Sequence, residues 1–430
     1  MKLLIANGRL IDPANGIDGI KNIAIADGKV LAVEDAGKAI ENFTPDRTID
    51  ALGLVVSPGF VDLSARLREP GYEHKATLAS EMQAAMQGGV TSLVCPPDTD
   101  PVLDEPGLVE MLKYRAAALN QAHVYPLGAL TVGLKGQALT EMAELTDAGC
   151  IGFSQANEPI IDTEVLLRAL QYANSFNYST WLQPEDPYLS KKGMAHSGPV
   201  AARLGLSGIS YIAETIRLHT IFELIRVTGA RIHLGRLSSA EGIELVRQAK
   251  KDGLPVTCDV GIHHIHLTED DIDFFDTNAR MTPPLRSRAD RLAITEGLLD
   301  GTIDAICSDH TPVDDDEKLL PFGEATPGAT GLELLLSLTL KWGQSLENDP
   351  SNLSKAIAKI TSDPAGILGK NCGKLSVGDK ADICVFDPSE SWTVEASKLA
   401  SQGKHTPFLG REIPGRVRLT IVEGKVTFER

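Results

Sequence analysis

The chain shows two different patterns of hydrophobic and polar positions. In residues 1–57, short apolar stretches such as LLIANGRLID are separated by turns that contain Gly, and residues 371–430 have the same texture. Short apolar runs bounded by Gly-containing turns are typical of β-strands joined by tight connections. Both ends of the chain are therefore predicted to be β-structure, and we expect them to meet in one small β-sandwich domain.

The central part of the chain, residues 58–370, alternates β-rich apolar pieces with stretches of helical periodicity. Apolar residues recur at three- and four-residue spacing over 76–89 and 162–176, which predicts amphipathic helices. The strand candidates are 59–63, 91–95, 123–129, 150–154, 178–183, 231–235, 255–260 and 303–308. Eight strands alternating with helices predict an α/β fold, a (β/α)8 TIM-like barrel over 58–370, flanked by the β-domain segments 1–57 and 371–430.

Charge and composition exclude several classes of protein. The 41 basic and 58 acidic residues give a net charge of −17, which disfavours binding to nucleic acid or to an anionic membrane. No apolar run reaches the roughly 18 residues that a membrane helix needs, and the N-terminus turns polar too early for a signal peptide. The six cysteines are scattered and are expected to be reduced. We therefore expect a cytoplasmic protein with no nucleic-acid or membrane partner.

Chemistry in such barrels takes place at the carboxyl ends of the strands, and these positions carry distinct motifs. The motifs are PGFVDLSARLREPG (58–71), LVCPPDTDP (93–101), HLGRLSS (233–239), NARMTPPLR (278–286) and CSDHTPV (307–313). Their order and content resemble the dihydroorotase branch of the amidohydrolase superfamily, over essentially the whole chain. The resemblance implies a barrel of the metal-dependent hydrolase type, which opens or closes the ring of a cyclic amide with one or two zinc ions.

The resemblance also identifies the metal-ligand positions, and most of them have changed. These positions hold Ser64, Arg66, Gln155 (or Ala156), Gln183, Arg236 and Asp309. Only Asp309 keeps the residue that the family has there. Because a catalytic zinc ion needs about three protein ligands, we expect no zinc and no other cofactor. We expect Asp309 to form a buried ion pair with Arg66 or Arg236 instead.

The residues that bind substrate in the family are partly retained. Arg68 and Asn278 match family positions that contact the substrate, and His310 matches the histidine beside the catalytic aspartate. Asp98 stands where the family has asparagine, and its charge would repel the carboxylate of dihydroorotate. We therefore interpret Arg68, Asn278 and Asp98 as remnants of a substrate pocket, and Asp309 and His310 as vestigial catalytic residues.

Two other polar segments have structural explanations. The sequence GIHHIHL contains His263, His264 and His266, and on a strand-to-loop segment this spacing does not place them on one face. We expect a structural or surface role for them rather than a metal site. The acidic run at 314–318 is expected to be a solvated loop.

The changed ligand positions make the chain similar to the non-catalytic dihydroorotase homologues that some bacteria carry beside a working dihydroorotase. In that group the inactive chain assembles with aspartate carbamoyltransferase of pyrimidine biosynthesis. The resemblance therefore implies this partner, an oligomeric state and a structural or regulatory role.

Two alternatives stay open. One is an active amidohydrolase that uses Asp309 and His310 without metal, or that binds zinc through other histidines. The other is a carboxylate-binding sensor that uses Arg68 and Asn278 and does no chemistry.

Overall fold

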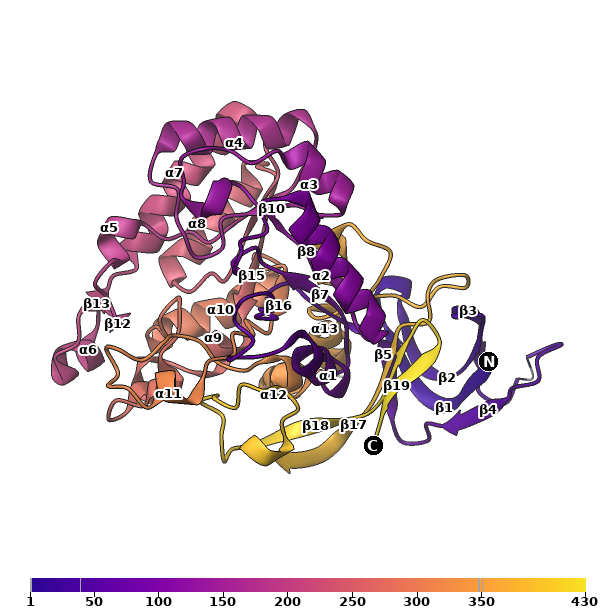
Figure 1. Cartoon of the computed structure of the whole chain (residues 1–430). Helices are drawn as coiled ribbons and strands as arrows, with labels where there is room; N and C mark the ends of the chain where they lie inside the picture. Colours follow the sequence, from indigo (N-terminus) through magenta and orange to yellow (C-terminus); the bar gives the residue numbers. More distant parts are fainter. Residues whose placement is uncertain (1, 39, 347–348, 350) are drawn as a thin grey trace.

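The computed structural model describes residues 2–38, 40–346, 349 and 351–430, and it contains the predicted barrel of parallel strands (Figure 1). Each of the eight predicted strand segments contains an observed strand, so the predicted (β/α)8 fold is confirmed. The segment 123–129 is divided at Leu127 into two short strands. The barrel strands are β6 (Phe60–Asp62), β7 (Val90–Cys95), β8 (His123–Pro126), β9 (Gly128–Ala129), β10 (Phe153–Ser154), β11 (Thr180–Leu182), β14 (Ile232–Leu234), β15 (Val256–Gly261) and β16 (Ala305–Cys307).

The last barrel strand returns to the first and closes the barrel. The strands pair in the orders β6-β7-β8 and β9-β10-β11-β14-β15-β16, and a parallel bridge joins Ala65 to His310. Arg66 N donates to His310 O at 2.9 Å, and His310 N donates to Ser64 O at 3.1 Å. This closure places residues 64–66 directly beside the segment that follows β16.

Helices cover the outside of the barrel (Figure 1), and α1 and α4 confirm the predicted helices 76–89 and 162–176. The longer helices are α1 (Leu78–Gly88), α2 (Pro106–Leu119), α3 (Met142–Ala148), α4 (Thr163–Ser175), α7 (Ile212–Thr228), α8 (Ala240–Lys251), α10 (Arg288–Asp300), α12 (Leu335–Ser345), α13 (Asn352–Ala358) and α14 (Ser362–Leu368). Helix α1 begins where Thr77 Oγ1 accepts the Ser80 N–H at 3.2 Å, and it ends at Gly89, whose φ of 78° suits glycine. Among the described helices, none has both the length and the apolar character needed to cross a bilayer.

Shorter elements lie in the connections of both units. They are α5 (Pro187–Ser190), α6 (Pro199–Leu204), α9 (Ile262–His266), α11 (Asp315–Lys318), β12 (Ala195–His196), β13 (Gly208–Ile209) and the 3-10 turns Pro13–Asn15, Val132–Leu134, Glu269–Ile272, Thr277–Ala279, Leu332–Leu334 and Ala396–Lys398. Most of these elements are inserted in the loops that surround the carboxyl ends of the strands.

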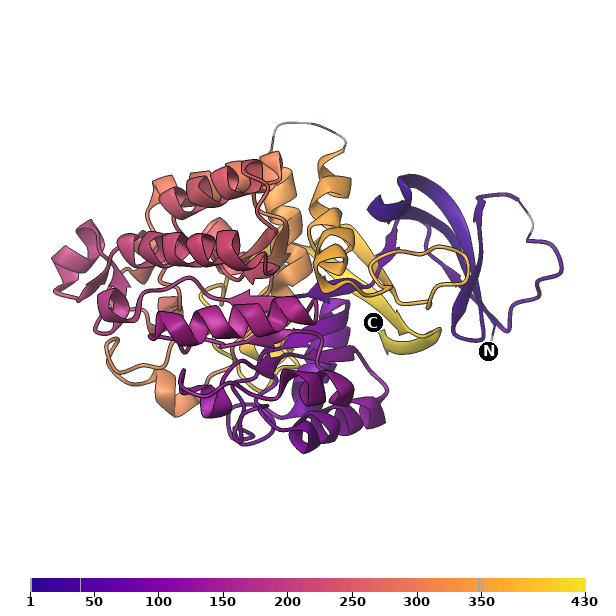
Figure 2. The same ribbon diagram turned by 90° about the horizontal axis from the view of Figure 1, so that it is seen from above.

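The two ends of the chain together form a second unit beside the barrel (Figure 2). Its strands are β1 (Leu3–Asp12), β2 (Ile17–Ala26), β3 (Lys29–Asp35), β4 (Arg47–Asp50), β5 (Val55–Pro58), β17 (Ile383–Thr393), β18 (Glu412–Val422) and β19 (Lys425–Glu429). They pair in the order β19-β18-β17-β5-β1-β2-β3, with β4 on β1. Ile383 lies opposite Pro58 in the antiparallel β17–β5 pair, so the C-terminal strands extend the N-terminal sheet as predicted.

One stretch of the C-terminal part leaves this sheet and packs on the barrel. Between β17 and β18, residues 394–411 run along the barrel, where Ser401 N donates to Glu333 Oε2 at 3.1 Å. Further along, His405 Nδ1 lies 3.1 Å from Asn278 Oδ1. The C-terminal segment therefore reaches the rim of the barrel mouth.

His310 and Glu81 form a buried pair that joins this stretch to the barrel. His310 Nε2 lies 2.6 Å from Glu81 Oε2, and both side chains are 0% exposed. His310 Nδ1 accepts the Gly331 N–H at 3.1 Å, so the ring proton is on Nε2 and is donated to Glu81. Ser401 Oγ donates to the same carboxylate at 2.7 Å. Burial raises the pKa of Glu81, but the hydrogen bonds from His310 and Ser401 outweigh burial and hold that pKa below its ordinary value.

Replacing Glu81 with alanine is expected to lower the free energy of unfolding by about 2 kcal/mol or more. The reason is that His310 and Ser401 then keep buried donors without an acceptor, at roughly 1–3 kcal/mol each. Urea unfolding of the full chain measures the loss. Glu164→Ala is the matched control, because the Glu164–Arg168 pair is exposed and contributes less than about 0.5 kcal/mol. An equally small loss in E81A would contradict this account.

Candidate functional site

Two arginine side chains occupy the mouth of the barrel, at positions that the resemblance assigns to metal ligands. Arg66 follows β6 and Arg236 follows β14, and only 4% and 7% of their surfaces are exposed. A guanidinium group stays charged when it is buried, so its N–H groups need acceptors inside the protein. The segments that follow β7, β10, β11 and β16 supply them.

Arg66 binds three acceptors from three different segments. Its Nε donates to Asp98 Oδ2 at 2.7 Å, its Nη1 to Thr311 Oγ1 at 3.1 Å and its Nη2 to Asn157 Oδ1 at 3.1 Å. Burial disfavours the charged form of Arg66, but the nearby carboxylates of Asp98 and Asp309 outweigh burial and raise its pKa. Arg66 is therefore a fixed positive charge.

Arg236 binds a second set of acceptors on the other side of Asn157. Its Nη1 donates to Asp309 Oδ1 at 3.1 Å, and its Nη2 donates to Asn157 Oδ1 and Gln183 Oε1. The ion pair expected for Asp309 thus forms with Arg236, and Arg66 pairs with Asp98 instead. The Asn157 oxygen accepts from both guanidinium groups and links the two pairs into one network.

Asp98 belongs to this network. Burial raises the pKa of its carboxyl group, but the charges of Arg66, Arg68 and Arg236 outweigh burial and hold the pKa below its ordinary value. Asp98 is therefore ionised at neutral pH, and its negative charge balances one of the arginines.

The other predicted substrate-pocket residues lie nearer the rim. Arg68 Nε donates to Pro312 O at 3.0 Å, and burial together with the charge of Arg66 lowers the pKa of Arg68 to about 10. Asn278 Oδ1 faces His405 Nδ1, whose ring also contacts Asp315. Asn278 is thus held by the C-terminal segment 394–411.

Two glutamines at former ligand positions point in different directions. Gln155 turns away from the mouth, where its Nε2 donates to Thr131 Oγ1 at 2.9 Å and to Leu134 O at 2.8 Å. Gln183 turns inward and accepts from Arg236. Ser64 lines the cavity at the mouth, and its carbonyl accepts the His310 N–H.

His233, which the motif HLGRLSS retains, has both ring nitrogens engaged below the arginines. Nε2 lies 2.9 Å from Asp259 Oδ2, and Nδ1 lies 2.9 Å from Thr257 Oγ1. Asp259 Oδ1 also accepts the Arg236 backbone N–H at 2.6 Å. Both ring nitrogens of His233 therefore already have hydrogen-bond partners within the protein.

The histidine run does not follow the predicted strand-to-loop path, because residues Ile262–His266 form the short helix α9. His263 and His264 are buried and His266 is half-buried. His264 Nε2 lies 3.1 Å from Pro283 O, and His266 Nε2 lies 2.8 Å from Leu338 O. Burial lowers the pKa of His263 to about 3 and that of His266 to about 4, so both are neutral. Their surroundings support the expected structural role.

The acidic run 314–318 is more ordered than a solvated loop. It contains helix α11, and Glu317 accepts from Lys75 Nζ at 2.7 Å. Lys318 is 3% exposed and donates to Thr277 O at 2.9 Å, and its burial lowers the pKa of Lys318 to about 8. The prediction of a solvated loop is wrong because these lysines anchor the run to the barrel rim.

The space left between the arginines and the barrel floor is small. A cavity of about 40 Å³ is lined by Ser64, Gln183 and His233 together with both arginines. At roughly 10–15 Å³ for a bound water, it has room for a few water molecules.

The side chains around this cavity do not fit a divalent metal ion. Across the described residues, no group of three or more His, Cys, Asp or Glu side chains is placed to hold a metal. Asp309 is already paired with Arg236, and His233 with Asp259. A guanidinium at ~4 Å repels a unit charge by about 4 kcal/mol at an effective dielectric of about 20, and a dication by roughly twice that.

The backbone at the strand ends is held in an uncommon conformation. Arg68, Ala156, Arg236 and Asp309 have φ values of 62°, 49°, 57° and 47°. Non-glycine residues with positive φ cost energy and cluster at functional sites. This backbone conformation therefore occurs at four residues around the barrel mouth.

Sequence reasoning missed Asn157 and Asp259, which hold Arg236 from either side. Asp259 lies in the strand-end sequence CDVG, so its position was a usable signal. Asn157 lies in the loop after β10, and no local pattern marks its contacts with residues 91 and 79 positions away.

Comparisons with known proteins agree with this architecture. A family profile described as dihydro-orotase-like matches residues 53–242, and an amidohydrolase family profile matches residues 225–428. A dihydroorotase-like protein from Pseudomonas aeruginosa is 42% identical over 429 residues and covers all of both chains. A dihydroorotase from Geobacter metallireducens is 41% identical over 430 residues, again across all of both chains.

Solved structures share the whole architecture. An L-hydantoinase (dihydropyrimidinase) from Arthrobacter aurescens superposes with a TM-score of 0.88 at 25% identity, covering 99% of this chain and 96% of that one. A D-hydantoinase superposes with a TM-score of 0.82 at 21% identity, covering 100% and 96%. Full-length relatives above 40% identity, together with the strand-end motifs, establish that the chain belongs to the dihydroorotase-like family of amidohydrolases.

Proposed function

We propose that this chain is a non-catalytic member of the dihydroorotase-like family. The observation that carries the proposal is the network of Arg66 and Arg236 with Asp98 and Asp309, which fills the mouth where the family holds zinc. Hydrolysis of a cyclic amide needs an activated water and a group that stabilises the developing oxyanion. In the family, zinc supplies both, and the side chains around Arg66 and Arg236 do not fit that ion.

The vestigial catalytic residues support the same proposal. Asp309 shares its carboxylate with Arg236, so one of its oxygens already accepts a charged hydrogen bond. His310 is fully buried, with Nε2 on Glu81 and Nδ1 accepting from Gly331. A general acid or base must come within hydrogen-bonding reach of the substrate, and this imidazole has neither a free nitrogen nor an exposed surface.

We further propose that the chain acts as a structural or regulatory partner of aspartate carbamoyltransferase, assembled as an oligomer in the cytoplasm. The support is the resemblance to non-catalytic dihydroorotase homologues, joined to a fold that is complete although its catalytic positions have changed. A protein whose role is structural needs a folded barrel and an intact surface, but it does not need zinc. The arginine network suits that need because it ties together the ends of six barrel strands, β6, β7, β10, β11, β14 and β16.

The sensor alternative is favoured by one observation. Arg68 donates only its Nε to a described acceptor, Pro312 O, and no described carboxylate lies within ion-pair distance. Its remaining N–H groups are thus available to a carboxylate ligand. Against this, its expected partner Asn278 is held by His405.

The purified full-length chain is expected to show no dihydroorotate hydrolysis above the buffer blank, with or without added zinc, because no metal-activated water forms at the mouth. An active dihydroorotase assayed in the same buffers is the positive control. Metal analysis of the same samples should give far less than one zinc per chain. Turnover that rises with stoichiometric zinc would overturn the non-catalytic proposal.

The double variant Ser64→His/Arg66→His is expected to remain inactive, because Gln183 and Arg236 still occupy other ligand positions. It should also unfold at lower urea concentration, since Asp98 loses its buried partner; breaking such a pair costs about 3–5 kcal/mol. The surface variant Arg226→His, which changes an exposed arginine, is the control for both measurements. Zinc-dependent hydrolysis by the double variant would show that the remaining ligands lie elsewhere in the chain.

Co-expression with the aspartate carbamoyltransferase of the same organism is expected to give one complex on size-exclusion chromatography. The tagged chain should retain the transcarbamoylase through affinity purification at physiological salt. A second tagged barrel protein without this resemblance serves as the control for non-specific capture. Separate elution of the two chains at micromolar concentration would contradict the partner proposal.

A further inference from the structure

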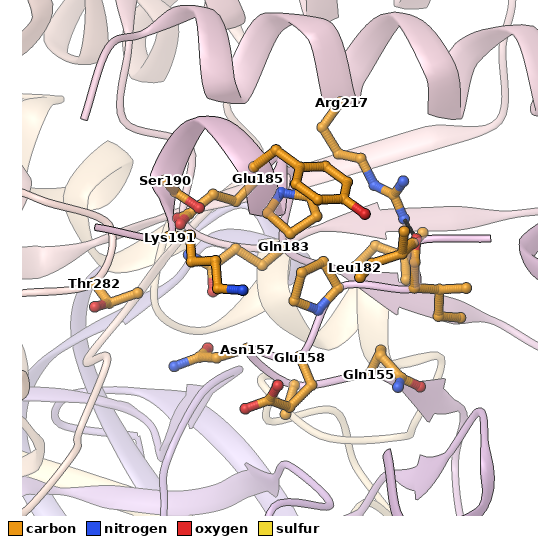
Figure 3. Close-up of a pocket in the computed structure, with 16 residues that line it drawn as sticks. Gln155, Asn157, Glu158, Leu182, Gln183, Glu185, Ser190, Lys191, Arg217 and Thr282 are labelled. Atoms are coloured by element: carbon orange, nitrogen blue, oxygen red, sulfur yellow. Dashed lines mark hydrogen bonds between the residues drawn. The ribbon is translucent and has the colours of Figure 1, made fainter. Parts of the chain in front are cut away.

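A second hollow lies beside the arginine network and is larger than the cavity at the barrel mouth. It has a volume of about 300 Å³ and is bounded by the loop after β10, the β11–α5 connection and α7 (Figure 3). Volumes from about 300 Å³ upward are typical of small-molecule sites. Its lining includes Gln155, Ala156 and Gln183 from the mouth, so the hollow adjoins the metal-ligand positions that the resemblance identifies. It does not include the substrate-pocket remnants Arg68, Asp98 and Asn278.

Arg217 reaches into this hollow from α7 and is only 7% exposed. Its Nη2 donates to Ile160 O at 2.9 Å, and among the described residues no carboxylate lies within ion-pair distance of its guanidinium. Asp186, whose charge acts to raise the pKa of Arg217, accepts the N–H groups of Tyr188 and Leu189 at the start of α5. Burial lowers the pKa of Arg217. A buried guanidinium without a carboxylate is costly, and an anionic ligand would remove that cost.

The opposite wall of the hollow carries charged side chains that, among the described residues, also have no ion-pair partner. In Figure 3, Asn157, Glu158 and Lys191 lie across the hollow from the Arg217 guanidinium. Within the described part of the chain, the Glu158 carboxylate and the Lys191 ammonium form no hydrogen bond or ion pair, and neither does the Glu185 carboxylate, which also lines the hollow. Solvent-facing charges are ordinary, but here they converge on one hollow together with a buried arginine.

The floor of the hollow is shared with the arginine network. The side-chain oxygens of Asn157 and Gln183 are taken by Arg236, so their NH2 groups are left as donors for a ligand. These two amides are held in place by buried charges, which gives the site a rigid inner wall.

We propose that this hollow binds a small zwitterion of the free amino acid class. Its carboxylate lies on Arg217, and its ammonium group lies on the carboxylates of Glu158 and Glu185. The lining has two cationic and two anionic side chains, so a ligand with one charge of each sign keeps the site neutral, whereas a singly charged ligand does not. This inference goes beyond the non-catalytic role and does not depend on it.

The test is a binding screen of the full-length chain against the twenty common amino acids, by thermal shift and then by isothermal titration calorimetry. At least one amino acid is expected to raise the melting temperature and bind saturably. Acetate and ethylamine, which each carry one of the two charges, are expected to bind at least tenfold more weakly. Absence of binding by every amino acid, or equal binding of acetate, would overturn the proposal.

Substitutions then locate the site. Arg217→Met is expected to weaken binding of the selected amino acid at least tenfold, since a charge-assisted carboxylate contact is lost. Arg226→Met is the matched control, because Arg226 lies on the same helix but is exposed and paired with Glu223. Glu158→Gln changes an exposed side chain without altering packing, so it tests the ammonium contact even if Arg217→Met does not fold. Unchanged affinity in both R217M and E158Q would overturn the assignment.

Discussion

Neutralising two buried guanidinium groups is the constraint on which the barrel mouth depends. Arg66 and Arg236 come from the ends of β6 and β14, where water has little access. Each takes one carboxylate, Asp98 or Asp309, and both share the oxygen of Asn157. Because an unpaired buried charge is very costly, these contacts fix the relative positions of the strand ends. The network thus holds the ends of several strands together.

Under the non-catalytic proposal, this network neutralises the barrel mouth without a metal ion. A dication binds carboxylates and imidazoles, and removing it alone would leave those groups crowded and repelling one another. Here cationic side chains stand at two ligand positions, and neutral amides or a hydroxyl at others. The strand-end backbone keeps its left-handed residues, Arg236 and Asp309 among them. Under the same proposal, the chain differs from the family in the charge of the side chains at the mouth.

The sequence was informative wherever the physical cause is local. Apolar β-rich runs that alternate with stretches of helical periodicity locate the eight barrel strands, and the motifs at the strand ends locate Ser64, Arg66 and Arg236. The histidine run was assigned to a strand-to-loop segment, but it forms α9, since short apolar segments that contain histidine suit either conformation. The sequence predicts that Asp309 pairs with Arg66 or Arg236 but does not decide between them. It does not predict the ion pair of Arg66 with Asp98, because that pair depends on closure of the barrel.

Contacts between distant segments were beyond any local pattern. The bridging oxygen of Asn157 and the path of residues 394–411 over the barrel rim depend on the assembled fold. The hollow beside Arg217 likewise exists only when α7 packs against the loop after β10.

The most direct test of the central claim is X-ray diffraction from crystals soaked in zinc, with data collected on both sides of the zinc absorption edge. The account predicts guanidinium density and no anomalous peak between Arg66 and Arg236. A strong anomalous peak there, with the arginines displaced outward, would contradict it.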